Sequence, residues 1–437
     1  MTVSGQIVDI INRRIYPGSI TVSEGRIEAI REHAVSEKHF ILPGFIDAHI
    51  HIESSMLTPY EFARMALPHG TVATISDPHE IANVCGMEGV RYMLENARKA
   101  ILKFNFGAPS CVPATTFETA GAVITAKDFE ALFRDDGLTY LAEMMNYPGV
   151  LHRDPLVMEK IDVAKKYTRP VDGHAPGLTG DDAANYISAG ISTDHECFTL
   201  EEALDKLSKG MKILIREGSA ARNFDALIPL MNEHSDRLMF CSDDKHPDDL
   251  ELGHINKLVS RAVKSGYDLF NVLQAACINP VTHYGMNTGI LRTGDPADFI
   301  IVKDLSEFDV LATYIDGKQV ATLGECSLPK GVHSHINRFS CTTKTPDDFK
   351  VQGEGTKINV IEALDGQLIT HKYESAAIWS NRELQSDPDN DILKIAVVNR
   401  YKNAPPAIGM IKNIGIRRGA IASTVAHDSH NIIAVGC

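Results

Sequence analysis

The sequence predicts an α/β protein with a (β/α)8 barrel over residues 41–289, a small flanking β-sandwich built from residues 1–40 and 290–345, and a C-terminal α+β domain over residues 346–437. Three observations predict this fold class. Strand-like and helix-like segments alternate through the middle of the chain, and β-rich stretches with tight turns precede and follow it. The length of 437 residues also exceeds the ~250–300 residues that one hydrophobic core usually organises.

The two β-rich stretches have similar patterns. Pro17-Gly18 and Glu24-Gly25 are turn signals that divide the first stretch into short strands. In the second stretch, Asp316-Gly317 is a dipeptide typical of a two-residue hairpin. We therefore expect the two ends of the central region to pair in one small β domain.

The central region contains eight strand-like segments separated by helical ones. These segments are FIDAHIH, TVATISD, FNFGAPS, LTYLAEM, RPVDGH, GISTDH, MKILIRE and RLMFCSD. Strands that alternate with helices form parallel βα units, and eight such units fit a (β/α)8 barrel.

Residues 346–437 mix strand-like runs with a glycine-rich segment, which is typical of a further α+β domain. The chain stops just after the strand-like run IIAV, so we expect this domain to be incomplete. Its segment His427-Asp428-Ser429-His430 resembles a hydrolase cluster but lacks the strand–turn–helix context of a nucleophile. We interpret it as a loop that closes over the barrel mouth.

Composition narrows the class of partner. Lys and Arg number 43 against 57 Asp and Glu, a net charge of −14, which argues against a nucleic acid partner. No apolar run approaches the ~20 residues of a membrane span, and the N-terminus lacks a secretory signal pattern. We expect a cytoplasmic, homo-oligomeric protein that acts on a small molecule. The eight cysteines form no CxxC pair and are expected to be free thiols.

The motif His49-Ile50-His51 ends the first barrel segment. In a strand, side chains at i and i+2 point to the same face, so two imidazoles can chelate one ion. The alternative is a pair of polar residues on a solvated edge.

Later segments also end in residues that bind metals, namely Glu143, His174, His195 and Asp243. Active sites of such barrels lie at the C-terminal ends of the strands, where these side chains would meet. Four imidazoles and two carboxylates exceed the three or four protein ligands that one ion needs, which predicts two ions. This mixture suits Zn²⁺, Fe²⁺ or Mn²⁺. Asp244 competes with Asp243, and each later histidine could instead be a core residue.

The same motifs carry a resemblance to a known family. The sequence is similar to the amidohydrolase superfamily and, within it, to the bacterial adenine deaminases. The similarity runs essentially end to end and rests on PGFIDAHIHIESS, SDPHEIANV, AEMMNYPGV, DGHAPGL, DHEC, IREGSAAR, FCSDDKHP and VAHDSHNIIAVG.

The resemblance implies a hydrolase acting on the C–N bond of a cyclic amidine. It would convert adenine to hypoxanthine and ammonia in purine salvage, through a hydroxide that bridges two metal ions. Mn²⁺ or Fe²⁺ is implied, and the ligand set also permits Zn²⁺.

The resemblance also implies metal and catalytic roles. Two imidazoles and an aspartate would hold the more buried ion, a glutamate would bridge both ions, and two further imidazoles would hold the second ion. In that order these residues are His49, His51, Asp243, Glu143, His174 and His195. Asp243 would also take the proton of the attacking hydroxide and deliver it to the leaving amine.

Four neighbouring residues are candidates for substrate contact. Asp77 and His79 would hydrogen-bond the imidazole edge of the purine, although an ordinary capped βα turn is the alternative. Arg216 and Ser219 follow the seventh strand, where a structural ion pair of the arginine is as plausible as a substrate contact.

Protonation of purine N1 needs an acid, for which Glu80 and Glu217 are both candidates. Two other functions stay open: another amidohydrolase reaction, on a cyclic amide or an N-acetyl sugar, and a non-catalytic barrel that serves as an assembly protein. The presence of all six candidate ligands argues against the non-catalytic alternative.

Overall fold

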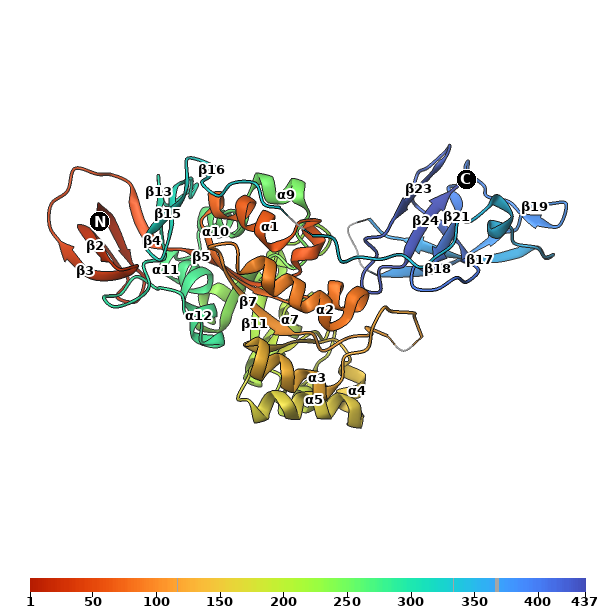
Figure 1. Ribbon diagram of the computed structural model, residues 1–437, viewed down its shortest axis with the longest axis horizontal. Helices are drawn as coiled ribbons and strands as arrows, with labels where there is room; N and C mark the ends of the chain where they lie inside the picture. Colours follow the sequence, from red (N-terminus) through yellow and green to blue (C-terminus); the bar gives the residue numbers. More distant parts are fainter. Residues whose placement is uncertain (116, 333, 366–368) are drawn as a thin grey trace. The chain divides into compact units, whose positions relative to one another are not determined.

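Eight parallel strands close into a barrel in the central region of the computed structural model, which describes residues 1–115, 117–332, 334–365 and 369–437 (Figure 1). Two sheets of five and three strands are joined by parallel bridges between Val171 and Ile191 and between Ile50 and Asp243. The strands are β5 (Phe45–Ile50), β6 (Thr71–Ser76), β7 (Lys103–Ala108), β8 (Tyr140–Met144), β9 (Val171–Gly173), β10 (Thr193–Asp194), β11 (Lys212–Arg216) and β12 (Leu238–Cys241). The predicted (β/α)8 barrel is confirmed; each strand lies in its predicted segment except β7, which begins one residue earlier, at Lys103.

Helices separate and follow these strands. They are α1 (Pro59–Ala66), α2 (His79–Ala97), α3 (Ala126–Ala131), α4 (Tyr147–Leu151), α5 (Pro155–Lys166), α6 (Gly180–Ser188), α7 (Leu200–Ser208), α8 (Phe224–Leu227), α9 (Pro247–Leu252), α10 (Ile255–Lys264), α11 (Leu269–Leu273) and α12 (Asn279–Tyr284). In α10, Ile255, Leu258, Val259 and Ala262 are buried at the i, i+3, i+4, i+7 spacing of one helix face. That face packs the helix onto the barrel, while its charged residues stay outside.

The barrel interior is filled by apolar side chains from five of the eight strands. Strands β5, β6, β8, β11 and β12 contribute the buried residues Ile46, Ala48, Ala73, Ile75, Tyr140, Ala142, Leu214, Met239 and Cys241. Apolar side chains fill the middle of the barrel. Polar side chains from different strands can therefore meet only at one of its two ends.

An eight-stranded sheet contains strands from both predicted β-rich stretches, in the order β16-β15-β14-β13-β4-β1-β2-β3. Its strands are β1 (Thr2–Asp9), β2 (Arg14–Ser23), β3 (Arg26–Glu32), β4 (Phe40–Pro43), β13 (Phe299–Val302), β14 (Val310–Ile315), β15 (Lys318–Thr322) and β16 (Glu325–Cys326). The antiparallel pair β4–β13 joins the two halves into one continuous hydrogen-bonded sheet. Asp316 and Gly317 both have positive φ and connect β14 to β15, as a type I′ hairpin requires.

The C-terminal region forms a six-stranded sheet in the order β18-β17-β22-β21-β24-β23, beside a two-stranded ladder of β19 and β20. The strands are β17 (Lys357–Ala363), β18 (Thr370–Ala376), β19 (Trp379–Ser380), β20 (Glu383–Leu384), β21 (Ile392–Val398), β22 (Ala407–Lys412), β23 (Ala420–Ser423) and β24 (Ile432–Gly436). Between residues 346 and 437, the described helical structure is one 3₁₀ turn, Pro346–Phe349. This region is therefore richer in β structure than the sequence predicted.

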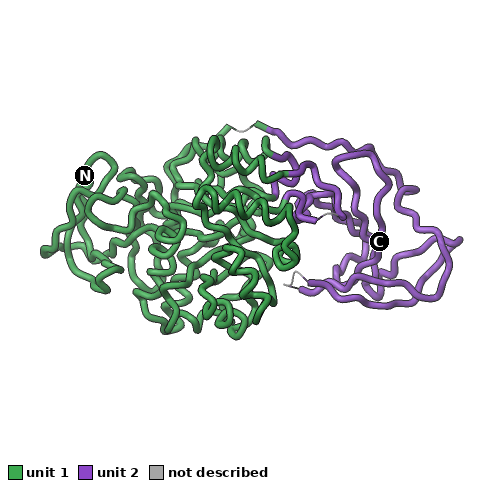
Figure 2. The backbone as a smooth tube through the Cα atoms, turned by 90° about the horizontal axis from the view of Figure 1, so that it is seen from below, with its two compact units in different colours: residues 1–79, 87–111, 124–334 green, residues 80–86, 112–123, 335–437 purple. Residues whose placement is uncertain are grey.

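The described chain divides into two compact units (Figure 2). The first unit, residues 1–79, 87–111 and 124–334, holds the barrel and the eight-stranded sheet. The second unit holds residues 80–86, 112–123 and 335–437. We propose the three-domain division given above, which differs from these units by assigning residues 80–86, 112–123 and 335–345 to the barrel and the small β domain. In the described part of the chain, every helix is too short or too polar to cross a bilayer.

His283 on α12 is a partly buried imidazole, and its surroundings oppose its protonation. Lys212 donates a hydrogen bond of 2.7 Å to its Nδ1, and the Ser192 hydroxyl lies 3.3 Å from its Nε2. Burial first, and then the adjacent Lys212 ammonium, lower the pKa of His283 to about 3. Between pH 6.5 and about pH 3, His283 is protonated in the unfolded chain but not in the folded chain. The free energy of unfolding therefore falls as the pH falls through this range.

We therefore expect His283→Gln to reduce the acid sensitivity of the barrel. The difference in unfolding free energy between variant and wild type should shift in favour of the variant by up to about 1.4 kcal/mol per pH unit below pH 6.5. Urea unfolding followed by far-ultraviolet circular dichroism from pH 8 to pH 4.5 measures this difference. Above pH 7 the unfolding free energies of variant and wild type should change with pH in the same way. If their difference also stays constant below pH 6.5, His283 is not the group that makes the barrel sensitive to acid.

Candidate metal centre

All six predicted ligands lie together at the C-terminal ends of the barrel strands. Strand β5 and the residue after it supply two imidazoles, and the ends of β8, β9, β10 and β12 supply one ligand each. We call this set the six-ligand cluster: His49, His51, Glu143, His174, His195 and Asp243. All are buried except His174, whose side chain is 24% exposed. The six-ligand cluster is thus almost closed to solvent, and His174 is its one partly exposed member.

The two imidazoles of the first strand meet the aspartate of the last. His49 Nε2 lies 3.2 Å from His51 Nε2, and these atoms lie 3.4 and 3.2 Å from Asp243 Oδ1. His51 Nδ1 lies 3.1 Å from the carbonyl oxygen of Asp77 and donates a hydrogen to it, which directs the lone pair of Nε2 toward His49. Three metal-binding atoms therefore face one another, an arrangement that a cation between them would stabilise.

The chain carries His49 into this position through a local irregularity. The pairing of β5 with β6 shifts register between Asp47 and Ile50. Such a bulge re-aims side chains beside active sites. The i, i+2 pattern predicted that the two imidazoles converge, but it gave no sign of the bulge.

Glu143 lies between two groups of imidazoles. Its Oε1 is 3.2 Å from His51 Nε2, and its Oε2 is 2.7 Å from His174 Nδ1 and 3.3 Å from His195 Nε2. Burial opposes its ionisation, but His174, with hydrogen bonds from His195 and His51, holds its pKa well below the ordinary value. A carboxylate whose two oxygens face opposite ligand groups is placed as a bridging ligand would be.

His195 touches both groups. Its ring stacks on that of His49 with centroids 4.0 Å apart and planes inclined by 19°. Burial alone would lower its pKa, but hydrogen bonds to Glu143 and Glu196 raise the pKa to about 10. The carboxylates of the site thus favour positive charge at this position, from a proton or from a metal ion.

Sequence reasoning missed Glu196. Its Oε1 lies 3.3 Å from His195 Nε2 and 3.7 Å from His174 Nδ1, within reach of the second group. The only signal was its place directly after His195, and strand alternation would have directed it away from the site. Strand β10 is only two residues long, so the chain has already left the extended form there.

Arg216 is fully buried and holds two carboxylates of the site. Its Nη1 donates to Asp243 Oδ2 at 2.7 Å and its Nη2 to Glu196 Oε2 at 3.1 Å. Burial opposes ionisation of Asp243, but Arg216 and then His49 and His51 hold its pKa well below the ordinary value. Arg216 therefore forms the structural ion pairs that were one of its two predicted roles, and the substrate contact stays a prediction.

Asp77 and His79 lie in the same cluster of groups. His79 Nδ1 is 3.0 Å from Asp77 Oδ2 and 3.3 Å from Glu143 Oε1, and its ring centroid is 4.5 Å from that of His51. The Asp77 carboxylate also accepts the backbone N–H of His79 at 3.0 Å. Both predictions for this segment are compatible with the geometry: the Asp77 carboxylate binds the first backbone N–H of α2, and the two side chains reach the cluster.

Two predicted residues lie outside the cluster. Glu217 directly follows the last residue of β11, and its carboxylate lies 3.1 Å from Arg261. The Ser219 hydroxyl donates to Asp249 at 2.6 Å and accepts the backbone N–H of His246 at 2.9 Å. These side chains are thus engaged in contacts outside the six-ligand cluster, and their roles as acid and substrate contact stay predictions.

The two remaining carboxylates have partners of their own. Asp244 Oδ1 accepts a hydrogen bond of 2.5 Å from Ser54, yet it also lies in ligand range of His51 and Asp243. Asp244 therefore stays a second candidate for the aspartate ligand. Glu80 belongs to the second unit, where both of its oxygens face imidazoles.

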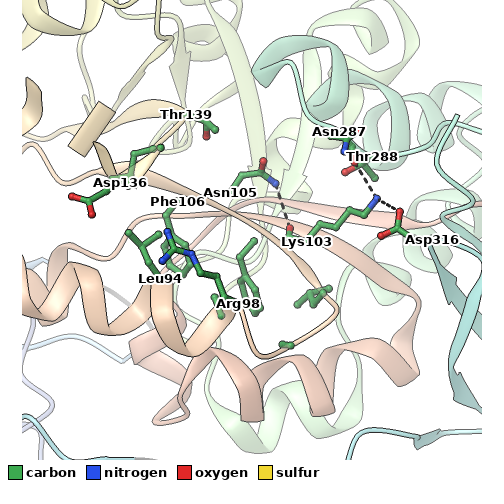
Figure 3. A pocket seen from close by; sticks show the side chains of 16 residues that line it. Leu94, Arg98, Lys103, Asn105, Phe106, Asp136, Thr139, Asn287, Thr288 and Asp316 are labelled. Carbon is green, nitrogen blue, oxygen red and sulfur yellow. Dashed lines mark hydrogen bonds and ion pairs between the residues drawn. The ribbon is translucent and has the colours of Figure 1, made fainter. Parts of the chain in front are cut away.

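A cavity of about 440 Å³ opens at the other end of the barrel (Figure 3). It is lined by Lys103, where β7 begins, and by Thr139, just before β8. Lys103 Nζ is already neutralised by Asp298 at 2.7 Å and Asp316 at 2.8 Å. The cavity thus lies at the N-terminal ends of the strands, away from the candidate metal ligands.

We expect Arg216→Met to destabilise the barrel by about 3–5 kcal/mol, because it leaves two buried carboxylates without their cation. Urea unfolding followed by circular dichroism measures the loss. Arg222→Met, on the exposed turn beyond the same strand, should cost less than about 1 kcal/mol. Equal effects of the two substitutions would show that the buried ion pairs do not hold the site together.

Two family models match the sequence. The model described as "Amidohydrolase family" matches residues 40–320, and the one described as "Adenine deaminase C-terminal domain" matches residues 367–437. Curated relatives called "Adenine deaminase" include those of Salinibacter ruber, 53% identical over 437 residues, and Methanosarcina mazei, 52% identical over 445 residues. The matches cover 100% and 99% of this chain and 80% of each relative.

Solved structures show the same fold at low sequence identity. The N-acetyl-D-glucosamine-6-phosphate deacetylase from Mycobacterium smegmatis is 14% identical, with a TM-score of 0.56, and the match covers 74% of this chain and 100% of that one. The β-aspartyl dipeptidase from Fervidobacterium islandicum is 14% identical, with a TM-score of 0.57, covering 76% of this chain and 100% of that one. At this level of sequence identity, these similarities support the fold and say nothing about activity.

Proposed function

The chain belongs to the adenine deaminase family of amidohydrolases, and we propose that it hydrolyses adenine to hypoxanthine and ammonia at the six-ligand cluster. The observation that carries this proposal is the identity of about half of all residues with curated adenine deaminases along the whole chain. The convergence of four imidazoles and two carboxylates at the barrel mouth supports it independently.

We propose that the cluster holds two divalent ions. His49, His51 and Asp243 would hold one, His174 and His195 the other, and the bridging carboxylate would be Glu143. The donor set fits such ions, because buried ring nitrogens face one another and carboxylate oxygens at 3.2–3.4 Å. Mn²⁺ or Fe²⁺ is the proposed metal, and Zn²⁺ is permitted. The chemistry that such ions supply when bound is to acidify a water molecule near neutral pH.

Asp243 is the proposed carrier of the proton. One oxygen of its carboxylate is held by Arg216 at 2.7 Å, and the other faces the imidazoles of His49 and His51. This fixed carboxylate would accept a proton from the attacking water and deliver it to the leaving nitrogen. A C–O bond forms at C6 of the purine, the exocyclic C–N bond breaks, and ammonia leaves.

Asp77 and His79 are the proposed contacts to the imidazole edge of the purine, since their side chains reach the cluster beside Glu143. Of the two predicted acids for N1, Glu217 faces away from the cluster, and the carboxylate of Glu80 is engaged by imidazoles of the second unit. Cytoplasmic location and a homo-oligomeric state stay predictions.

We expect the metal-loaded chain to release ammonia from adenine and to produce hypoxanthine. Removing the metal with a chelator should abolish the reaction, and Mn²⁺ or Fe²⁺ should restore it. N-acetyl-D-glucosamine-6-phosphate is the control substrate, because a sugar deacetylase shares the fold. Release of acetate from the sugar without release of ammonia from adenine would favour the other amidohydrolase reaction. No turnover of either, with no metal bound, would favour a non-catalytic barrel.

We expect Glu143→Gln to lower turnover by more than about 100-fold, since loss of even an outer-shell partner of a metal ligand costs 10–100-fold. The substitution keeps the shape of the side chain, so circular dichroism should be unchanged. The bound metal, measured by elemental analysis, should fall together with activity. Glu233→Gln, on an exposed turn of the same barrel, is the matched control. Activity of the Glu143 variant near that of this control would remove Glu143 from the site.

A further inference from the structure

The second unit contains its own group of metal-binding side chains, outside the six-ligand cluster. Glu80 from the start of α2 faces His427 and His430 from the loop before β24. His427 Nδ1 is directed at Glu80 Oε1, and His430 Nε2 at Glu80 Oε2. One ligand atom from each residue lies within 4.8 Å of the others. Two imidazoles thus converge on one carboxylate from a loop about 350 positions away in the chain.

This group is largely buried. Glu80 is 1% exposed and His430 is 7% exposed, whereas the side chain of His427 is 33% exposed. Burying a carboxylate is costly unless positive charge and hydrogen bonds compensate for it. Protons on the imidazoles, or a cation that the three side chains share, would supply such compensation. The exposed side of His427 leaves a route by which an ion from solvent can enter.

The tautomer of His430 decides whether its Nε2 can bind a cation, and two backbone groups contact Nδ1. Its Nδ1 lies 3.2 Å from the carbonyl oxygen of Thr424, and a hydrogen donated there leaves Nε2 with a lone pair that points at Glu80. Two acceptors then face each other, which only a second proton or a metal ion can relieve. A backbone carbonyl that fixes the tautomer in this way is the usual partner of a histidine that binds a metal. The alternative is that Nδ1 accepts the N–H of Ala426 at 3.3 Å, so that Nε2 donates to Glu80.

The loop that carries both histidines is fixed by buried polar contacts. Arg400, 2% exposed, donates to the carbonyl oxygen of His430 at 3.2 Å, and the Tyr401 hydroxyl donates to that of Ser429 at 2.5 Å. Asn431 accepts the backbone N–H of Arg400 at 3.2 Å and donates to the carbonyl oxygen of Thr119 at 2.9 Å. The geometry of the two imidazoles is therefore set by the fold of the second unit and does not depend on a chance surface encounter.

We infer that Glu80, His427 and His430 bind a third divalent ion, separate from the six-ligand cluster. Two imidazoles and one carboxylate, with a position left for water, are a ligand set that Zn²⁺ accepts in proteins. The ion would link the start of α2 to the C-terminal loop inside the second unit. This site goes beyond the proposed deaminase function and does not rest on it.

The test is a count of bound metal on the full chain. Wild type and the double variant His427→Gln/His430→Gln are stripped with a chelator, loaded with Zn²⁺, desalted and measured by elemental analysis. Glutamine can still donate a hydrogen bond to Glu80 but is a poor metal ligand. We expect wild type to retain one equivalent more than the double variant. His371→Gln, on exposed strand β18, is the matched control and should retain as much as wild type.

Equal metal in wild type and the double variant would overturn the inference and leave ordinary hydrogen bonds at Glu80. Glu80→Gln provides a second variant from another part of the chain, which should also lose one equivalent, so that misfolding of one variant cannot decide the result. If the six-ligand cluster binds no metal, the difference of one equivalent between wild type and the variants is still expected. The two proposals therefore fail separately.

An independent readout comes from Trp379, the single tryptophan of the chain, which lies in the second unit. An ion that binds the folded form stabilises it by mass action. We expect Zn²⁺ to raise the urea midpoint of the Trp379 fluorescence change in wild type and in His371→Gln. The midpoint of the double variant should not move with Zn²⁺. A shift of the same size in the double variant would place the bound ion elsewhere.

Discussion

The arrangement of the barrel mouth depends on one electrostatic constraint: three buried carboxylates lie next to one another and need positive charge. Glu143 is compensated by imidazoles, while Asp243 and Glu196 share the guanidinium of Arg216. The carboxylates repel one another, and none of them is exposed enough for water to screen the repulsion. Arg216 alone cannot balance all three, so the remaining charge falls on the histidines. A site that raises the pKa of His195 to about 10 is also a site that attracts metal ions.

Closure of the barrel is what brings the first and last ligands together. The backbone N–H of Asp243 donates to the carbonyl oxygen of His49 at 2.9 Å, and the N–H of His51 donates to that of Asp243 at 3.1 Å. Ligands 192 or more positions apart in the chain are thereby held by two main-chain hydrogen bonds, as a continuation of the β5–β12 pairing. The relative position of these ligands is therefore a property of the sheet and does not depend on side-chain flexibility.

The sequence predicted the fold and the six-ligand cluster because both follow from local periodicity. A polar residue at the end of an apolar strand is visible in one segment, and barrel topology brings such ends together. Glu196 and the partners of Arg216 were not predictable in this way, because they depend on how the chain turns after a two-residue strand. The expectation that Glu80 protonates the purine faced the same difficulty. Its imidazole partners come from the far end of the chain, and no local pattern indicates that pairing.

A second polar layer behind the cluster links the fold to the chemistry. Asp47 is fully buried; its Oδ1 accepts the backbone N–H of Ser242 at 3.1 Å and that of His49 at 3.3 Å. Its Oδ2 lies 2.8 Å from His254 Nε2, and His254 Nδ1 lies 2.6 Å from the hydroxyl of Thr71 on β6. One carboxylate thus binds the backbone beside the first metal-binding histidine and beside the aspartate ligand. The Asp47 carboxylate therefore holds the backbone of both strands. Displacing either ligand would break buried hydrogen bonds. The fold itself thus positions the ligands at the barrel mouth, independently of a bound metal ion or substrate.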